Sequence, residues 1–108
     1  MKRNIIYTVM KMKFFIVEGI IKNAKGMSET LLKEHIAYTQ KVMNQGQYLF
    51  SGLKSDHSGG MFMIKAESKE WLEEYLYNEP FYKAGIQEYK IQPIDVHWSN
   101  EQASTWFK

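Results

Sequence analysis

His35 and Glu79 are the residues of this sequence whose types and placement point most directly to chemistry. His35 lies in the segment 28–46, which reads as a helix, and at 100° per residue it falls near the middle of an apolar arc. That arc is formed by Leu31, Leu32, Ile36, Tyr38, Thr39, Val42 and Met43. An imidazole on a buried face must find a hydrogen-bond partner, because burying it unpaired costs about 1–3 kcal/mol.

Glu79 is the partner that the sequence offers. It lies at the C-terminal end of a second expected helix, and continued helically it would fall between Trp71 and Leu76 on the apolar side. A carboxylate against an imidazole selects the tautomer of the ring, raises its basicity and stabilises the imidazolium, which is the chemistry of an acid/base dyad. The alternative is a satisfied core histidine and a surface glutamate that never meet.

The remaining polar groups favour simpler interpretations. His57 lies in a polar loop, where a histidine is usually exposed to solvent and has no further role. Asp56 is expected to support the turn of this loop, and His97 lies in the last expected strand. The three histidines lack the spacing of metal ligands, so we expect no metal. Ser51 is a candidate hydrogen-bonding group, but no base neighbours it in the sequence, so it is not expected to be a nucleophile.

Composition restricts the class of protein. The 108 residues make one domain, without cysteine, and 14 basic against 12 acidic residues give no reason to expect nucleic-acid binding. No apolar stretch of about 18 residues predicts a membrane span, and Lys11 and Lys13 interrupt what would otherwise resemble a secretion signal. We therefore expect a soluble, cytoplasmic protein, and nothing marks a cofactor site.

Hydrophobic periodicity predicts the elements that must position these groups. Strands are expected at 10–18, 47–53, 61–66 and 88–98, and helices at 28–46 and 69–78, with a polar loop at 54–60. This βαββαβ order is that of an α+β, ferredoxin-like fold, a four-stranded antiparallel sheet with two helices on one face. Residues 1–11 are an N-terminal extension or an early strand, and 99–108 form a tail. The alternation changes phase at Pro93, which predicts a bulge or an edge position.

Both faces of the expected sheet are apolar. Residues 14–17 and 61–64 are consecutive apolar runs, so neither strand has a polar side. Helices cover only one face, and we expect a second copy of the chain to cover the other, giving a homodimer through the sheet face. The alternative is that the tail or the N-terminal segment folds over that face.

Several short motifs resemble those of the YCII-related (YciI-like) domain family. They are His35 followed by Tyr38, the strand end Ser51-Gly52, and Glu79-Pro80-Phe81 followed by Ala84-Gly85. The likeness covers about residues 12–96. The resemblance implies a dimeric α/β barrel with a His–Asp site in a cleft. It also implies a small-molecule enzyme, since the activities assigned to members of the family include elimination from chlorinated aromatics. Glu79 replaces the usual Asp, and Leu53 stands where a proline often follows the glycine.

Together these features predict a cofactor-independent lyase or isomerase acting on a compact organic ligand, aromatic or cyclic. His35 would shuttle a proton and Glu79 would orient it, while Tyr38, Ser51, Gly52 and Phe81 would bind the substrate. The alternative is a non-catalytic ligand-binding or interaction module of the same fold. A haem- or oxygen-dependent monooxygenase is a weaker third reading.

Overall fold

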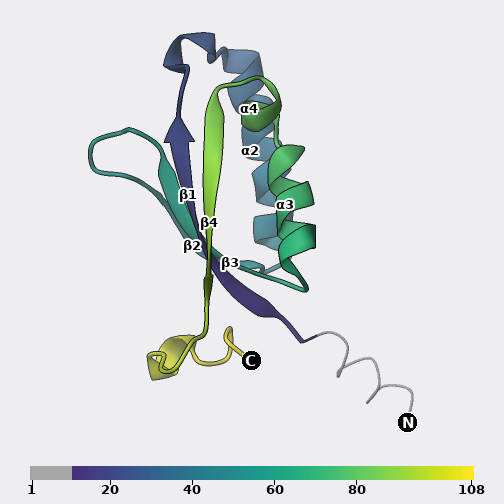
Figure 1. Ribbon diagram of the computed structural model, residues 1–108, viewed down its shortest axis with the longest axis vertical. Coiled ribbons are helices and arrows are strands. Elements are labelled where there is room, and N and C mark those ends of the chain that lie inside the picture. The colour runs from purple at the N-terminus through teal and green to yellow at the C-terminus, as the bar shows by residue number, and fades with distance from the viewer. Residues whose placement is uncertain (1–10) are drawn as a thin grey trace.

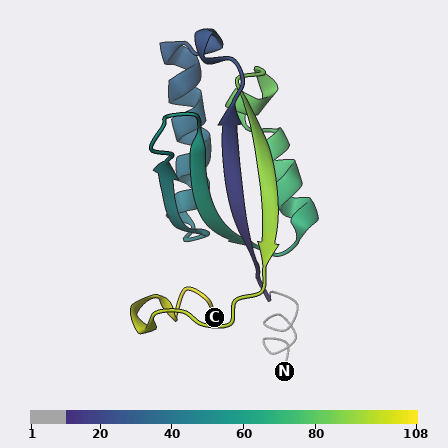
Figure 2. The ribbon, with the colours of Figure 1, turned by 60° about the vertical axis from the view of Figure 1, so that its left-hand side comes forward.

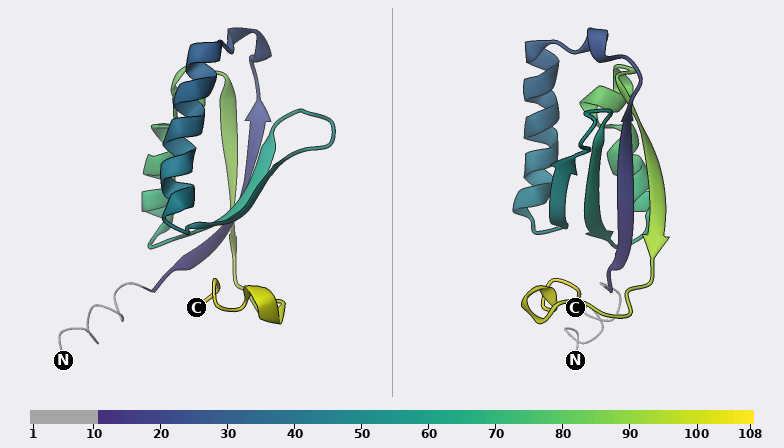
Figure 3. Two further views of the ribbon diagram at one scale, coloured as in Figure 1. Left: turned by 180° about the vertical axis from the view of Figure 1, so that it is seen from behind. Right: turned by 90° about the vertical axis from the view of Figure 1, so that its left-hand side faces the viewer.

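The computed structural model describes residues 11–108, so the expected N-terminal extension lies almost wholly outside the described residues. Its main elements are β1 (Lys13–Ile21), α2 (Glu29–Asn44), β2 (Tyr48–Leu53), β3 (Gly60–Ala66), α3 (Lys69–Tyr77), α4 (Pro80–Lys83) and β4 (Gln87–Ile94). Two 3-10 turns, η1 (Ala24–Gly26) and η2 (Glu101–Ala103), complete the list. The strands form one antiparallel sheet in the order β2-β3-β1-β4, with α2, α3 and α4 on one side of it (Figures 1 and 3). The ferredoxin-like α+β prediction is confirmed. Within the described residues no helix is long and apolar enough to cross a membrane.

The core lies between the sheet and the helices. Phe15 pairs with Ile64 and Val17 with Phe62 across β1 and β3, and all four side chains face the helical layer. Leu72 and Leu76 of α3 pack on this side, together with other buried apolar residues. Alternation along β1 produces this division, because successive side chains of a strand point to opposite faces.

Helix α2 is less buried than its sequence predicts. It begins at the cap Ser28, whose side chain accepts a hydrogen bond from the Leu31 N–H. Of its residues only Val42 is buried, while Leu32 is 42% and Ile36 51% exposed. The expectation of a buried apolar arc is therefore wrong for most of this helix, because a cavity separates it from the sheet.

The last strand also differs from the prediction. β4 ends at Ile94 instead of continuing to residue 98, and it pairs with β1 through Pro93 without a shift of register. β4 is an edge strand, where the missing N–H of a proline is tolerated, so of the two expectations the edge position is correct. The irregularity lies instead in β2, between Tyr48 and Phe50.

The C-terminal tail docks on the open face of the sheet, at one end (Figure 2). The rings of Trp106 and Phe107 lie 5.6 and 5.3 Å from that of Phe14. Lys65 Nζ donates a hydrogen bond to the Trp106 carbonyl at 2.6 Å, and Trp106 Nε1 donates to the Gly46 carbonyl at 2.8 Å. The tail thus covers part of the open face, in line with the alternative drawn from the sequence.

Candidate active site

The structure brings His35 and Glu79 together. His35 Nδ1 lies 2.8 Å from Glu79 Oε2, and the Glu79 side chain is 1% exposed whereas that of His35 is 23% exposed. Glu79 lies beyond the end of α3, because the following Pro80 holds it in an extended conformation. It is instead the N-cap of α4, and its Oε2 also accepts a hydrogen bond from the Phe81 N–H at 2.8 Å.

A third donor completes the surroundings of this carboxylate. The Tyr89 hydroxyl donates to Glu79 Oε1, and Gln87 Nε2 in turn donates to the Tyr89 oxygen at 3.0 Å. With three donors around it, we assign Glu79 as the acceptor of the shared bond and Nδ1 of His35 as its donor. Nε2 of the neutral ring then keeps a lone pair, and no group within residues 11–108 hydrogen-bonds to it.

Phe81 fixes the plane of the imidazole. The two rings are stacked with centroids 4.0 Å apart and an angle of 5° between their planes. Phe81 is itself buried, so its ring is held by the protein core. The imidazole is therefore constrained by a hydrogen bond at one edge and by an aromatic ring on one face.

His35 and Glu79 line a cavity of about 480 Å³ between α2, α4 and the sheet. That volume fits a small organic molecule, and the walls are mainly apolar, as in most ligand sites. Apolar walls come from Ile21, Met27, Leu32, Met43, Leu53, Met61, Phe62, Leu76 and Phe81, and polar ones from Thr39, Tyr48, Ser51, Tyr75, Gln87 and Tyr89.

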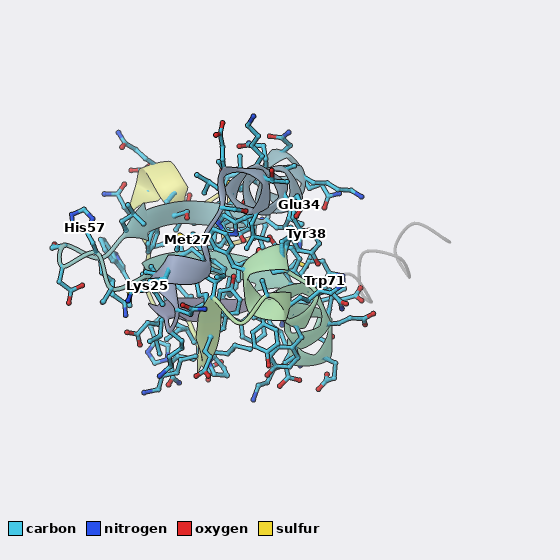
Figure 4. The ribbon with its side chains drawn as sticks, turned by 90° about the horizontal axis from the view of Figure 1, so that it is seen from above. Lys25, Met27, Glu34, Tyr38, His57 and Trp71 are labelled. Atoms are coloured by element: carbon cyan, nitrogen blue, oxygen red, sulfur yellow. The ribbon has the colours of Figure 1, made fainter. Side chains whose placement is uncertain are left out.

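Three of the four expected substrate contacts lie at this cavity. Ser51, Gly52 and Phe81 line it, whereas Tyr38 does not. The Tyr38 hydroxyl donates to the Tyr75 carbonyl at 2.8 Å, and its ring lies in a separate hollow beside Trp71, between α2 and α3 (Figure 4).

The sequence analysis gave no role to Tyr89, Gln87, Tyr48 or Tyr75, all of which line the cavity. Burial, helped by the charge of nearby Glu79, raises the pKa of Tyr48, Tyr75 and Tyr89, so these phenols stay protonated and able to donate. A signal for Tyr89 was present, because the strand alternation places it on the core face, where a phenol needs a partner.

The other two histidines lie apart from this site. His57 sits on the loop that projects from the β2–β3 hairpin (Figure 4), and His97 is exposed beyond the end of β4. Across residues 11–108, no three His, Cys, Asp or Glu side chains are grouped so that they could hold a metal ion.

Fold and site together define a class: a ferredoxin-like α+β domain whose helical layer holds a carboxylate–imidazole pair over a cavity. The family model of the YCII-related domain matches residues 12–95, so the chain belongs to the YCII-related domain family. No curated protein matches the chain.

A solved structure shares the fold. It is 5-chloro-2-hydroxyhydroquinone dehydrochlorinase from Burkholderia phenoliruptrix AC1100, in complex with 2,5-dihydroxybenzoquinone. The TM-score is 0.58 at 17% sequence identity, and the match covers 82% of this chain and 96% of that one. At this identity the likeness concerns the fold alone.

Proposed function

We propose that this protein is a small-molecule enzyme, a lyase or isomerase in which the His35–Glu79 pair transfers a proton. The observation that carries the proposal is the imidazole itself, bonded to a buried carboxylate through Nδ1 and partly exposed at a cavity of ligand size. A purely structural histidine would have no need of an unoccupied nitrogen at such a cavity.

In this mechanism Nε2 of His35 removes a proton from the substrate while Glu79 stabilises the imidazolium. The electron pair of the broken bond then forms a new double bond. In an elimination the leaving group departs with its own bonding pair, and in an isomerisation the imidazolium returns the proton to a different atom. Histidine suits this cycle because its unperturbed pKa of about 6.5 lies near neutrality.

The substrate that we propose is a compact aromatic or cyclic molecule. The mainly apolar walls favour a ring, and Ser51, Gly52 and Phe81, which line the cavity, would contact it. The structural neighbour was solved with a quinone, which is a ring compound of this kind.

The test is hydrogen exchange in D₂O with a panel of hydroxylated and chlorinated ring compounds, followed by NMR. The wild type should exchange or eliminate at least one of them, and His35→Ala should lower that rate by about 10²–10⁴, the usual contribution of a general base. His97→Ala, which changes an exposed histidine that does not line the cavity, is the matched control. A His35→Ala variant that keeps the wild-type rate would reject the mechanism.

The alternative function, a ligand-binding module without chemistry, makes a different prediction. It requires ring compounds to bind while no exchange or turnover occurs in the wild type. The exposure of the His35 ring at the cavity favours the enzyme.

A further inference from the structure

Two tyrosines form a hydrogen-bonded pair in the wall of the cavity. Tyr48 on β2 and Tyr75 on α3 place their hydroxyl oxygens 2.8 Å apart. Tyr75 is 7% exposed, and the ring of Tyr48 stacks on that of Phe62. The pair is therefore rigid, largely buried and in contact with the space that a ligand would fill.

The two hydroxyl groups carry two hydrogens, but only one of these takes part in a hydrogen bond within the described part of the chain. Each phenol carries one hydrogen, and only one of the two can lie between the oxygens. Within residues 11–108 neither hydroxyl is hydrogen-bonded to a third group. Burial raises the pKa of both phenols, so the second hydrogen is retained near neutrality. A buried O–H without an acceptor is unfavourable, so the pair has a hydrogen to donate to an acceptor that enters the cavity.

The other polar groups of the cavity are less suited to this role. The Thr39 hydroxyl already donates to the His35 carbonyl at 3.1 Å, and Gln87 donates to Tyr89. The Tyr89 hydroxyl donates to Glu79, and Ser51 is exposed. The tyrosine pair is thus the buried donor that remains available among the described residues of the cavity.

We propose that Tyr48 and Tyr75 form an oxygen-binding subsite that donates a hydrogen bond to a carbonyl oxygen of a ring-shaped ligand. The ligand class that follows is a hydroxy-substituted aromatic or cyclic carbonyl compound, with its hydroxyl toward His35 and its carbonyl toward the tyrosines. The orientation toward His35 rests on the proposed function, whereas the oxygen subsite does not. If His35 removes the proton of a group that is conjugated with that carbonyl, negative charge is delocalised onto the carbonyl oxygen. The tyrosine pair would then stabilise this charge through a fixed hydrogen-bond donor.

The test compares ligands that differ only in the carbonyl. The 3- and 4-hydroxyacetophenones are matched with 3- and 4-ethylphenol, in which a methylene replaces the carbonyl. Using both isomers makes the result independent of the spacing between the two oxygens. By calorimetric titration the wild type should bind the better ketone about tenfold more tightly than its ethyl analogue, as expected for one buried hydrogen bond.

The decisive variant is the double substitution Tyr48→Phe with Tyr75→Phe. A single substitution leaves one hydroxyl whose hydrogen is free for the ligand, so both hydroxyls must be removed. Removing both partners of a hydrogen bond with little change of shape is tolerated by a core. The double variant should lose the preference for the ketone, whereas Tyr77→Phe, on the exposed side of the same helix, should keep it.

A carbonyl-labelled probe gives a second readout. The ¹³C resonance of the ketone bound to the wild type should lie downfield of that of the ketone bound to the double variant, because only the wild type has the tyrosine donors. Equal affinity for ketone and ethyl analogue in the wild type, the same carbonyl resonance in both proteins, or no binding of either ketone at millimolar concentration would each overturn the subsite. A ketone preference that persists in the double variant would do the same. In His35→Ala the preference should remain, so a failure of proton transfer is distinguishable from a failure of the subsite.

Discussion

The chemistry of an imidazole depends on which of its two nitrogens holds the hydrogen. In this protein Glu79 Oε2 accepts from Nδ1 of His35, and Phe81 stacks on the ring, so Nε2 is the nitrogen available to a ligand. Tyr89 acts one step further away, since its hydroxyl bonds the other oxygen of the same carboxylate. Its contribution is to position Glu79 and to offset the cost of burying it.

Replacing Tyr89 by phenylalanine should therefore destabilise the protein. The variant leaves a buried carboxylate with one donor fewer and deprives Gln87 of its acceptor. We expect a loss of about 1–3 kcal/mol in the free energy of unfolding, measured by urea denaturation. Tyr82→Phe is the control, because the Tyr82 hydroxyl makes no hydrogen bond within residues 11–108 and its ring stacks on that of Tyr89. Equal stability of the two variants would contradict this account of Tyr89.

At the residue scale the sequence predicted the pair but not its supports. The helical arc placed His35 inward, and the chain order placed Glu79 near it, so the contact followed from the topology. Tyr48, Tyr75 and Tyr89 come from three different elements. The hydroxyls of Tyr48 and Tyr75 meet across 27 residues of sequence, and a single sequence contains no local pattern for such a contact. Tyr89 bonds Glu79 and Gln87 within ten residues, and only its place on the core face of the strand pointed to a partner.

At the scale of elements, the loop after β2 is held tightly against β1. The Ile21 N–H donates to the Ser58 carbonyl at 2.9 Å. A Cβ built on Gly59 would lie only 1.8 Å from the carbonyl oxygen of Gly19. Glycine is therefore required where these two backbones meet, and both glycines line the cavity.

Gly59→Ala should displace the β2–β3 loop from β1. Because the neighbouring atoms are backbone, they cannot rotate away, and we expect a loss of about 2 kcal/mol or more in the free energy of unfolding. Gly52→Ala is the matched control, since its Cβ would meet no atom within 4 Å. Chemical denaturation of the two variants compares them directly, and a Gly59→Ala variant as stable as Gly52→Ala would refute the close approach.

Periodicity predicted the four strands and the helices α2 and α3 within a few residues, since each has a regular apolar side that the sequence displays. It did not predict α4, which has only four residues. The exceptions have tertiary causes. The apolar arc of α2 is partly exposed because several of its residues line the cavity. An apolar residue that lines a cavity and one that packs in the core give the same pattern in the sequence. The segment 95–98 keeps strand-like alternation, but it has no partner strand, because β1 begins at Lys13 and its pairing with β4 starts at Phe14 and Ile94.

At the scale of the whole molecule, the tail covers only one end of the open sheet face. Phe50 remains 49% exposed on that face, in register with Met63 of β3 and Ile16 of the central strand β1. An apolar surface of this kind is normally covered by another protein surface. We propose that a second copy of the chain covers it, as a two-fold dimer packed sheet to sheet.

The dimer is tested by light scattering on a size-exclusion column. The wild type should elute with twice the mass of the chain, and Phe50→Lys should shift it toward the monomer, because a charge would be buried without a partner. Ile36→Lys introduces the same charge at a similarly exposed position on α2 and should leave the dimer intact. A monomeric wild type, or dissociation by the α2 variant alone, would exclude this interface.

One atom of Glu79 bears on how such a protein can evolve. Because Oε2 both caps α4 and binds the imidazole, natural selection for folding acts on the acid even when selection for turnover has ceased. Under the proposed mechanism, a descendant that no longer catalyses the reaction could lose its histidine, whereas loss of the acid would leave α4 without its cap. Among related genes, the histidine would therefore mark those that keep the proposed activity.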